Sequence, residues 1–120
     1  MVRGIGIDLV SVEEFARRLE RTPSLRERLF SPRELELSYS PESLAGRFAV
    51  KEAVLKALGT GLSGGISWRD VEVVGGVDER PRVVLSGRAK EVAEGLSLLV
   101  SVSHAHGLAV AVCVAVSSRT

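Results

Sequence analysis

Residues 41–58 read PESLAGRFAVKEAVLKAL, and this stretch decides the fold because it is the longest segment with a helical pattern. Ser40 is followed by a proline, which is typical of the first residues of a helix. Gly59 follows the last helical position, where glycine commonly ends a helix. The apolar stripe consists of Leu44, Phe48, Leu55 and Leu58. We therefore expect one long helix whose stripe packs against the other elements.

The segments on either side of this helix predict a single α+β domain over residues 1–120. Further helix starts are expected at Ser11, Pro23, Ser31 and Ser86, the first and third through capping boxes. Leu96 is expected on the apolar face of the last of these helices. Strands are expected at 2–10, 68–74, 82–85, 98–104 and 108–116, the last two as a hairpin. Because helices dominate the first half and strands the second, we expect an antiparallel-rich sheet packed with the long helix.

The composition excludes several classes of protein. The chain has 120 residues, 45% of them hydrophobic, and 16 Lys and Arg against 15 Asp and Glu. That balance argues against a general nucleic-acid or membrane-surface binder. One cysteine excludes an internal disulfide and suits a reducing compartment. With no membrane-length apolar run and no signal-peptide pattern, we expect a cytoplasmic protein, and its thin core favours an oligomer.

Asp8 is a candidate site residue within the first strand. It shares one strand face with Gly4 and Gly6, and glycine in a strand tends to mark close approach of a ligand or another backbone. The opposite face carries Ile5, Ile7 and Leu9. We favour a site, although Asp8 could also end the strand and cap the next helix.

Glu52 and Lys56 stack one turn apart at the edge of the helical stripe. Ala45 and Ala49 share their side, which would leave room for a bulky ligand. The alternative is an i,i+4 surface pair. Two carboxylates from separate elements, with waters and phosphate oxygens, are a common way to hold Mg²⁺, so Asp8 and Glu52 are candidate ligands.

Three further features are compatible with an anionic ligand. The glycine-rich loop 59–65 could present backbone N–H groups to phosphates, or be only a flexible turn. His104 ends a strand beside a turn, where it would either meet a ligand or have a structural role. The arginines of residues 17–33 form either a solvated face or a docking patch for an acidic partner.

Five segments resemble, in order, the motifs of holo-[acyl-carrier-protein] synthases, which are small phosphopantetheinyl transferases. They are residues 4–10 (GIGIDLV), 44–61 (LAGRFAVKEAVLKALGTG), 68–73 (WRDVEV), 85–87 (LSG) and 102–104 (VSH). The second is the most specific, and the resemblance covers essentially the whole chain. It implies a 4′-phosphopantetheinyl transferase-like fold assembling as a homotrimer, with active sites at the subunit interfaces.

The resemblance also implies an activity. The chain would move the 4′-phosphopantetheine arm of coenzyme A onto a serine of apo-acyl carrier protein, releasing 3′,5′-ADP, in fatty-acid or polyketide synthesis. Asp8 and Glu52 would ligate Mg²⁺, and Lys56 would meet the diphosphate. The candidate coenzyme-binding positions are Arg47, Lys56, Gly59, Thr60, Gly61 and His104. The base for the serine is either Glu52, acting through water, or a water on the metal.

By the same resemblance, basic residues would recognise the acidic helix of the carrier protein. These are Arg17, Arg18, Arg21 and Arg28. Many members carry a Glu and a basic residue where this chain has Ser11 and Glu14, so Arg17 or Arg18 would replace that contact. Two rival functions stay open: a non-catalytic module that binds nucleotide diphosphates, and a Mg²⁺-dependent phosphohydrolase that uses the same carboxylates.

Overall fold

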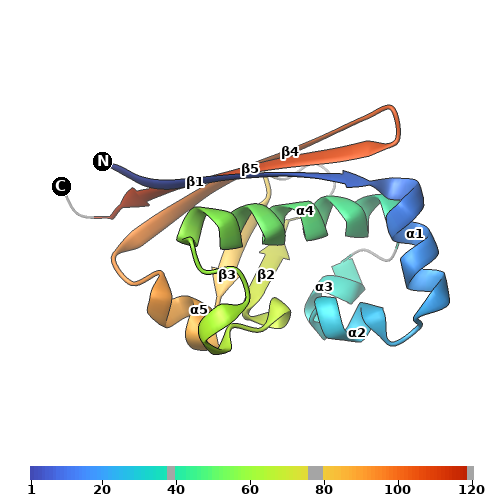
Figure 1. Cartoon of the computed structure of the whole chain (residues 1–120), viewed down its shortest axis with the longest axis horizontal. Helices are drawn as coiled ribbons and strands as arrows, with labels where there is room; N and C mark the ends of the chain where they lie inside the picture. The colour runs from blue at the N-terminus through green and yellow to red at the C-terminus, as the bar shows by residue number, and fades with distance from the viewer. Residues whose placement is uncertain (38–39, 76–79, 119–120) are drawn as a thin grey trace.

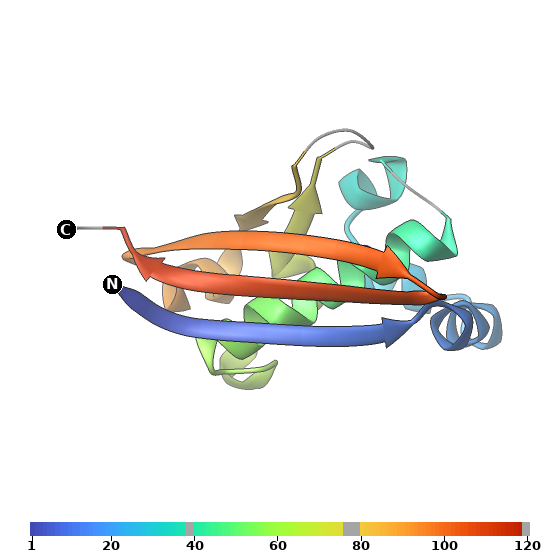
Figure 2. The same ribbon diagram turned by 90° about the horizontal axis from the view of Figure 1, so that it is seen from above.

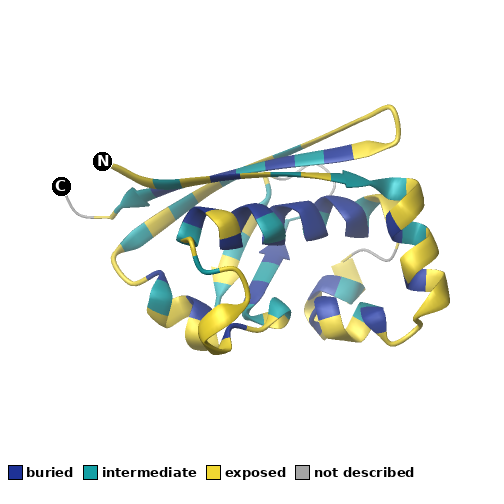
Figure 3. Cartoon of the chain, viewed as in Figure 1, coloured by how far each residue is buried: buried dark blue, intermediate teal, exposed yellow. Residues whose placement is uncertain are grey.

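The long helix lies at the centre of the computed structural model, which describes residues 1–37, 40–75 and 80–118 (Figure 1). This helix, α4 (Pro41–Leu58), has the predicted bounds. The Ser40 hydroxyl accepts a hydrogen bond from the backbone N–H of Ser43, and Gly59 ends the helix with a left-handed φ of 77°. Buried residues occupy most of its surface (Figure 3), so α4 contributes more to the core than the predicted stripe alone.

A three-stranded antiparallel sheet lies across one side of α4. Its strands are β1 (Val2–Ser11), β4 (Leu96–Ala105) and β5 (Leu108–Ser117), in the order β1-β5-β4. The predicted hairpin of β4 and β5 is confirmed, and it turns through His106 and Gly107, which both have positive φ. Leu96 was expected on a helix, and that prediction is wrong because it begins β4.

Two glycines let β1 lie directly on the backbone of α4. A Cβ atom at Gly4 would come within 2.1 Å of the carbonyl oxygen of Ala57, and one at Gly6 within 2.0 Å of that of Ala53. These glycines therefore serve packing between strand and helix. Of the two alternatives that the sequence left open for these glycines, close approach of another backbone is the one observed.

The outer face of this sheet is apolar, and no element of the described chain covers it (Figure 2). Ile5, Ile7 and Leu9 of β1 are 67%, 63% and 62% exposed, and Leu99 of β4 is 58% exposed. The predicted alternation along β1 is thus present, but its apolar side faces away from α4. A contiguous exposed apolar surface of this kind usually marks a contact with another protein.

Three short helices close one end of α4 (Figure 1). α1 (Val12–Arg21) begins after Ser11, whose side chain accepts the backbone N–H of Glu14 as predicted, and α3 (Pro32–Leu37) follows its own cap. α2 (Leu25–Leu29) starts two residues after Pro23, because residues 22–25 form a hydrogen-bonded turn, so the start predicted at Pro23 is wrong. The aromatic side chains packed at this end are Phe15, Phe30 and Phe48.

A two-stranded sheet and a short helix lie on the other side of α4 (Figure 1). The strands are β2 (Val71–Val74) and β3 (Arg82–Leu85), and the helix is α5 (Gly87–Val92), which begins at the predicted position. The three-residue turn η1 (Ser63–Gly65) lies in the glycine-rich loop. Of the helices that the structure describes, none is both long and apolar enough to cross a membrane.

The strand predicted from Trp68 is wrong in its first half. Residues Trp68–Asp70 form a 3₁₀ turn, η2, because Ser67 caps them and Asp70 accepts the backbone N–H of Ser67 at 3.0 Å. This capping box outweighs the short apolar alternation that had indicated a strand.

A fully buried ion pair joins α3 to α4. Lys51 Nζ lies 2.8 Å from Glu34 Oε1, and both side chains are 0% exposed. Nζ also donates to the carbonyl oxygens of Trp68, at 3.0 Å, and Val71, so its three protons have three acceptors. The other carboxylate oxygen of Glu34 accepts the backbone N–H of Val73 at 3.0 Å. The pair therefore connects α3, α4, η2 and β2.

Candidate active site

β1 and α4 bring three of the predicted site residues together. Lys56 Nζ lies 3.1 Å from Asp8 Oδ1 and donates a second hydrogen bond to the carbonyl oxygen of Ile7 at 3.0 Å. The Lys56 side chain is 53% exposed, and that of Asp8 is 16% exposed. Asp8 and Glu52 line one cavity of about 430 Å³. Two carboxylates therefore line a single cleft, which we call the acidic cleft, and the exposed Lys56 is paired with one of them.

The electrostatics of the acidic cleft raise the pKa of the Glu52 carboxyl above its usual value. Burial is the main cause, and the negative charge of Asp8 adds to it, whereas the positive charges of Lys56 and Arg18 oppose it. A carboxylate with a raised pKa accepts a proton more readily near neutral pH. The environment of Glu52 thus suits a general base.

The open space beside Glu52 is not on the side that the sequence indicated. Ala45 and Ala49, expected to leave room for a ligand, are fully buried in the core. The cavity is walled instead by aromatic side chains, among them Phe48 and Trp68, whose ring centroids lie 5.1 Å apart. Trp68 was not among the predicted site residues. The signals for it were that it is the single tryptophan of the chain and that it begins the segment 68–73, which resembles a family motif.

Asp8 and Glu52 fit Mg²⁺ as part of a ligand set. Their oxygens are the hard ligands that Mg²⁺ prefers, and they are close enough for the charge of one to affect the other. Among the residues that the structure describes, no three His, Cys, Asp or Glu side chains gather around one point. Mg²⁺ commonly binds one or two carboxylates and takes its other ligands from water and phosphate oxygens.

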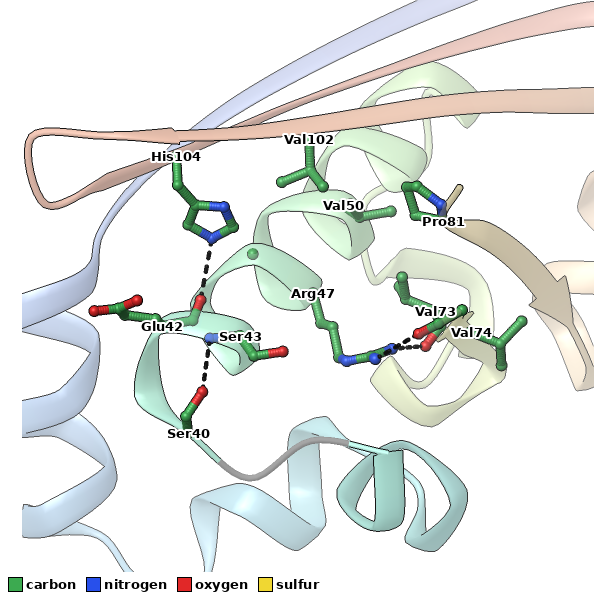
Figure 4. Close-up of a pocket in the computed structure, with 12 residues that line it drawn as sticks. Ser40, Glu42, Ser43, Arg47, Val50, Val73, Val74, Pro81, Val102 and His104 are labelled. Atoms are coloured by element: carbon green, nitrogen blue, oxygen red, sulfur yellow. Dashed lines mark hydrogen bonds between the residues drawn. The ribbon is translucent and has the colours of Figure 1, made fainter. Parts of the chain in front are cut away.

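Arg47 lines a different cavity, of about 560 Å³, which shares no lining residue with the acidic cleft (Figure 4). Its guanidinium donates to the carbonyl oxygens of Val73 and Gly75, the latter at 3.2 Å. Burial lowers the pKa of Arg47, and the charge of Glu34 partly offsets that effect. Arg47 therefore lies beside β2 in this second pocket, with its guanidinium fixed by hydrogen bonds to backbone carbonyl groups.

His104 faces Arg47 across the same pocket (Figure 4). Its Nε2 lies 3.2 Å from the carbonyl oxygen of Glu42, and because a carbonyl only accepts, Nε2 carries a proton. The ring can lie this close to α4 because position 46 is glycine. A Cβ atom at Gly46 would come within 2.8 Å of His104 Cε1.

Three predicted coenzyme-binding residues, Gly59, Thr60 and Gly61, line neither cavity. Gly59 and Gly61 have φ values of 77° and 57°, and a Cβ atom at either would meet nothing within 4 Å. Glycine is therefore needed here for backbone conformation and not for packing. Within one chain, the structure does not bring this loop together with His104.

The structure separates the four predicted docking arginines. Arg17 is paired with Glu13 at 2.5 Å on the solvent side of α1, and Arg21 and Arg28 are exposed as well. Arg18, by contrast, lines the acidic cleft with Glu52. The one-residue step between Arg17 and Arg18 turns their side chains to different surfaces of the same helix.

The buried pair Glu34–Lys51 is the largest feature of this region that the sequence did not reveal. Glu34 was expected only as a capping residue of α3, which it also is, since it accepts the N–H of Ser31 at 3.0 Å. Lys51 has no carboxylate one turn away on either side, so no local spacing pointed to an ion pair.

Comparison with known proteins agrees with this geometry. A family model for the 4′-phosphopantetheinyl transferase superfamily matches residues 4–113. The chain belongs to this superfamily. The transferase is 49% identical over 114 residues to the holo-[acyl-carrier-protein] synthase of Clavibacter sepedonicus, with 92% of each chain covered. It is 42% identical over 122 residues to that of Alkaliphilus metalliredigens, covering 96% of this chain and 99% of the relative.

Solved structures of synthases share the fold of this transferase. The Helicobacter pylori holo-[acyl-carrier-protein] synthase in complex with coenzyme A superimposes with a TM-score of 0.84 at 35% identity, covering 93% of this chain and 99% of that chain. The resemblance recognised in the five sequence segments and the predicted α+β fold class are therefore confirmed.

Proposed function

We propose that this transferase moves the 4′-phosphopantetheine arm of coenzyme A onto a serine of an apo-acyl carrier protein and releases 3′,5′-ADP. The observation that carries the proposal is that Asp8 and Glu52 line one cleft and Lys56 pairs with Asp8, in a chain of this superfamily. Fatty-acid or polyketide synthesis in the cytoplasm is the setting in which such a carrier would be used.

Asp8 and Glu52 would hold Mg²⁺ through their carboxylate oxygens, and the ion would offset negative charge on the diphosphate and on the departing 3′,5′-ADP. Lys56 supports this arrangement from the protein side. Its ammonium has three protons, two of which are used by Asp8 and Ile7, and its side chain is half-exposed. The third proton is free to bind a phosphate oxygen.

Glu52 is the proposed base, acting through a water molecule. The serine hydroxyl of the carrier attacks the β-phosphorus of coenzyme A, so that a new Oγ–P bond forms and the bond to the α-phosphate oxygen of 3′,5′-ADP breaks. The hydroxyl proton passes to Glu52 and the bond electrons leave with the phosphate.

Coenzyme A would extend from the acidic cleft of one subunit to the Arg47 and His104 pocket of its neighbour in a homotrimer. The support is that the two cavities share no lining residue within a chain, and that the outer sheet face is apolar. Loop 59–61 would also contact the coenzyme. Mixing the inactive variants Asp8→Asn and Arg47→Ala should restore part of the activity, because hybrid interfaces contain one intact site. If mixing the two variants restores no activity, active sites shared between chains are contradicted.

The carrier protein would dock on the exposed arginines of α1 and α2. Arg17, Arg21 and Arg28 are exposed to solvent on these two helices, and their positive charge suits an acidic helix. Reversing the charge of Arg21 or Arg28 should raise KM for the carrier and flatten its salt dependence. An unchanged KM refutes this docking surface.

One experiment tests the function itself. The transferase is incubated with coenzyme A, Mg²⁺ and an apo-acyl carrier protein, and the intact carrier is weighed by mass spectrometry. Gain of one phosphopantetheine is expected with the wild type and with Glu94→Gln, a matched change at an exposed carboxylate. It should be lost with Glu52→Gln. Binding of coenzyme A without transfer would instead indicate a non-catalytic module, and release of phosphopantetheine to water a phosphohydrolase.

A further inference from the structure

Arg18 has a position in the acidic cleft that the docking role does not require. It lies on α1, two turns after the capping Ser11, and lines the cavity of about 430 Å³ together with Asp8, Glu14 and Glu52. Its positive charge reaches the Glu52 carboxylate, since it lowers the pKa of that group against the effect of burial. Arg18 therefore faces the space in which the reaction would take place.

Arg18 is also the cation that this cavity leaves available. Among the described residues, its guanidinium has no ion pair or hydrogen bond, whereas Arg17 is held by Glu13. Lys56 is not among the residues that line the cavity, and it is already bonded to Asp8. A ligand anion in the cleft would thus find Arg18 unpaired.

The chemistry of the cleft indicates which anion that would be. With Asp8 and Glu52 committed to a metal ion, the group that lies against them is a diphosphate, which carries several negative oxygens. A guanidinium presents a planar fork of N–H donors that matches two phosphate oxygens, and such charge-assisted bonds are strong where water is partly excluded. The aromatic walls at Phe15, Phe48 and Trp68 provide that partial exclusion.

We propose that Arg18 binds a phosphate of the coenzyme A diphosphate in the acidic cleft, and so acts on the coenzyme and not on the carrier protein. This inference rests on the proposed function, because that function places the diphosphate there. It assigns to α1 two separate tasks, with Arg17 facing the carrier and Arg18 facing the coenzyme.

Coenzyme A binding without any carrier protein tests this assignment. Isothermal titration with Mg²⁺ present should show that Arg18→Ala weakens coenzyme A binding about tenfold, as expected for loss of a charge-assisted hydrogen bond. Arg18→Lys should recover part of the loss, since it restores the charge but not the fork. Arg17→Ala, which removes the same charge from the same helix, should leave coenzyme A binding unchanged. All three variants should keep the wild-type melting temperature, because both arginines are exposed.

The possible results separate this inference from the proposed function. If Arg18→Ala binds coenzyme A as the wild type does, the inference is overturned whether or not transfer occurs. A variant that raises only the KM for the carrier identifies Arg18 as a docking residue and also overturns it. If the wild type binds coenzyme A in an Arg18-dependent manner but modifies no carrier, the inference stands and the proposed function fails. Absence of coenzyme A binding by the wild type overturns both.

Discussion

Helix α4 carries two lysines, five residues apart, that each pair with a carboxylate from another element, and the two pairs differ in nearly every physical respect. Lys51 and Glu34 are both 0% exposed, and each proton of Lys51 has an acceptor. Lys56 is 53% exposed, only two of its three protons have acceptors among the described residues, and its partner Asp8 lines the acidic cleft. All three protons of Lys51 are therefore hydrogen-bonded within the chain, whereas Lys56 has two such bonds.

The difference indicates how a small domain separates stability from chemistry. A buried charge must be fully compensated, because its desolvation costs several kcal/mol. A charge at a site must keep unused bonding capacity, because a ligand has to take it up. α4 achieves both by presenting Lys51 to α3, η2 and β2, and Lys56 to the exposed edge beside β1.

Breaking the buried pair should have the largest effect on the protein. Lys51→Met leaves the buried Glu34 carboxyl without its ion-pair partner, and should lower the free energy of unfolding by about 3–5 kcal/mol. Urea denaturation at neutral pH measures this loss. Lys56→Met is the matched control, since it makes the same chemical change on the same helix, and should cost no more than about 1 kcal/mol. Equal losses at the two positions would contradict the distinction between the pairs.

Removing the second lysine should act on the reaction instead. Lys56→Met takes away a cation from the proposed phosphate site and should lower kcat about 100-fold, the loss typical of one transition-state donor. Initial rates of carrier modification at saturating coenzyme A and carrier give kcat, and circular dichroism checks that the fold is intact. A normal kcat would mean that Lys56 serves only to hold Asp8.

The same contrast separates what the sequence could predict from what it could not. Ser11, Ser31, Ser40 and Gly59 were assigned correctly because capping depends on side chains within four residues of the backbone they satisfy. The partners of Lys51 lie 17 and 20 residues away, and the contact exists only after α3, η2 and β2 have packed. No periodicity along the chain contains that information.

The candidate site was predictable in part for a similar reason. The stacking of Glu52 and Lys56 follows from helix geometry alone. Which strand face meets α4 depends instead on packing. The glycines of β1 indicated close approach of either a ligand or another backbone, and only the packed structure shows that they admit the helix backbone and that Ile5 and Ile7 face outward. The step between Arg17 and Arg18 became meaningful only when α1 was placed beside the cleft.

A third prediction concerns the effect of the ionised Glu52 carboxylate on the stability of the fold. The pKa of Glu52 is raised in the folded protein, so the folded state holds that proton more tightly than the unfolded state does. The resulting stability is present below the ordinary pKa of 4.5 and is lost as the pH rises through the folded value. In metal-free protein at pH 7, Glu52→Gln should therefore melt about 1 °C higher than the wild type, a small shift because the group is partly screened by solvent.

This difference should disappear when the pH falls below 4.5, where the wild-type carboxyl is protonated in both states. Thermal melts followed by circular dichroism at several pH values measure it, and Glu94→Gln provides the control at an exposed carboxylate. A wild type that is the more stable of the two at pH 7 would show that ionised Glu52 is not a burden on the fold.

The smallest expected effect is on the labelling rate of Cys113. This residue belongs to neither ion pair, but its labelling shows how far each pair controls unfolding. Its side chain is fully buried in β5, opposite Gly6, and burial raises its pKa to about 11. A thiol reagent at pH 8 should therefore label the native protein only when it unfolds, because both the thiolate fraction and access to the sulfur are minimal. Lys51→Met should accelerate labelling in proportion to its loss of stability, whereas Lys56→Met should label at nearly the wild-type rate. Rapid labelling of the wild type would show that the sheet opens locally above α4, and the buried pair would then not control access to this part of the core.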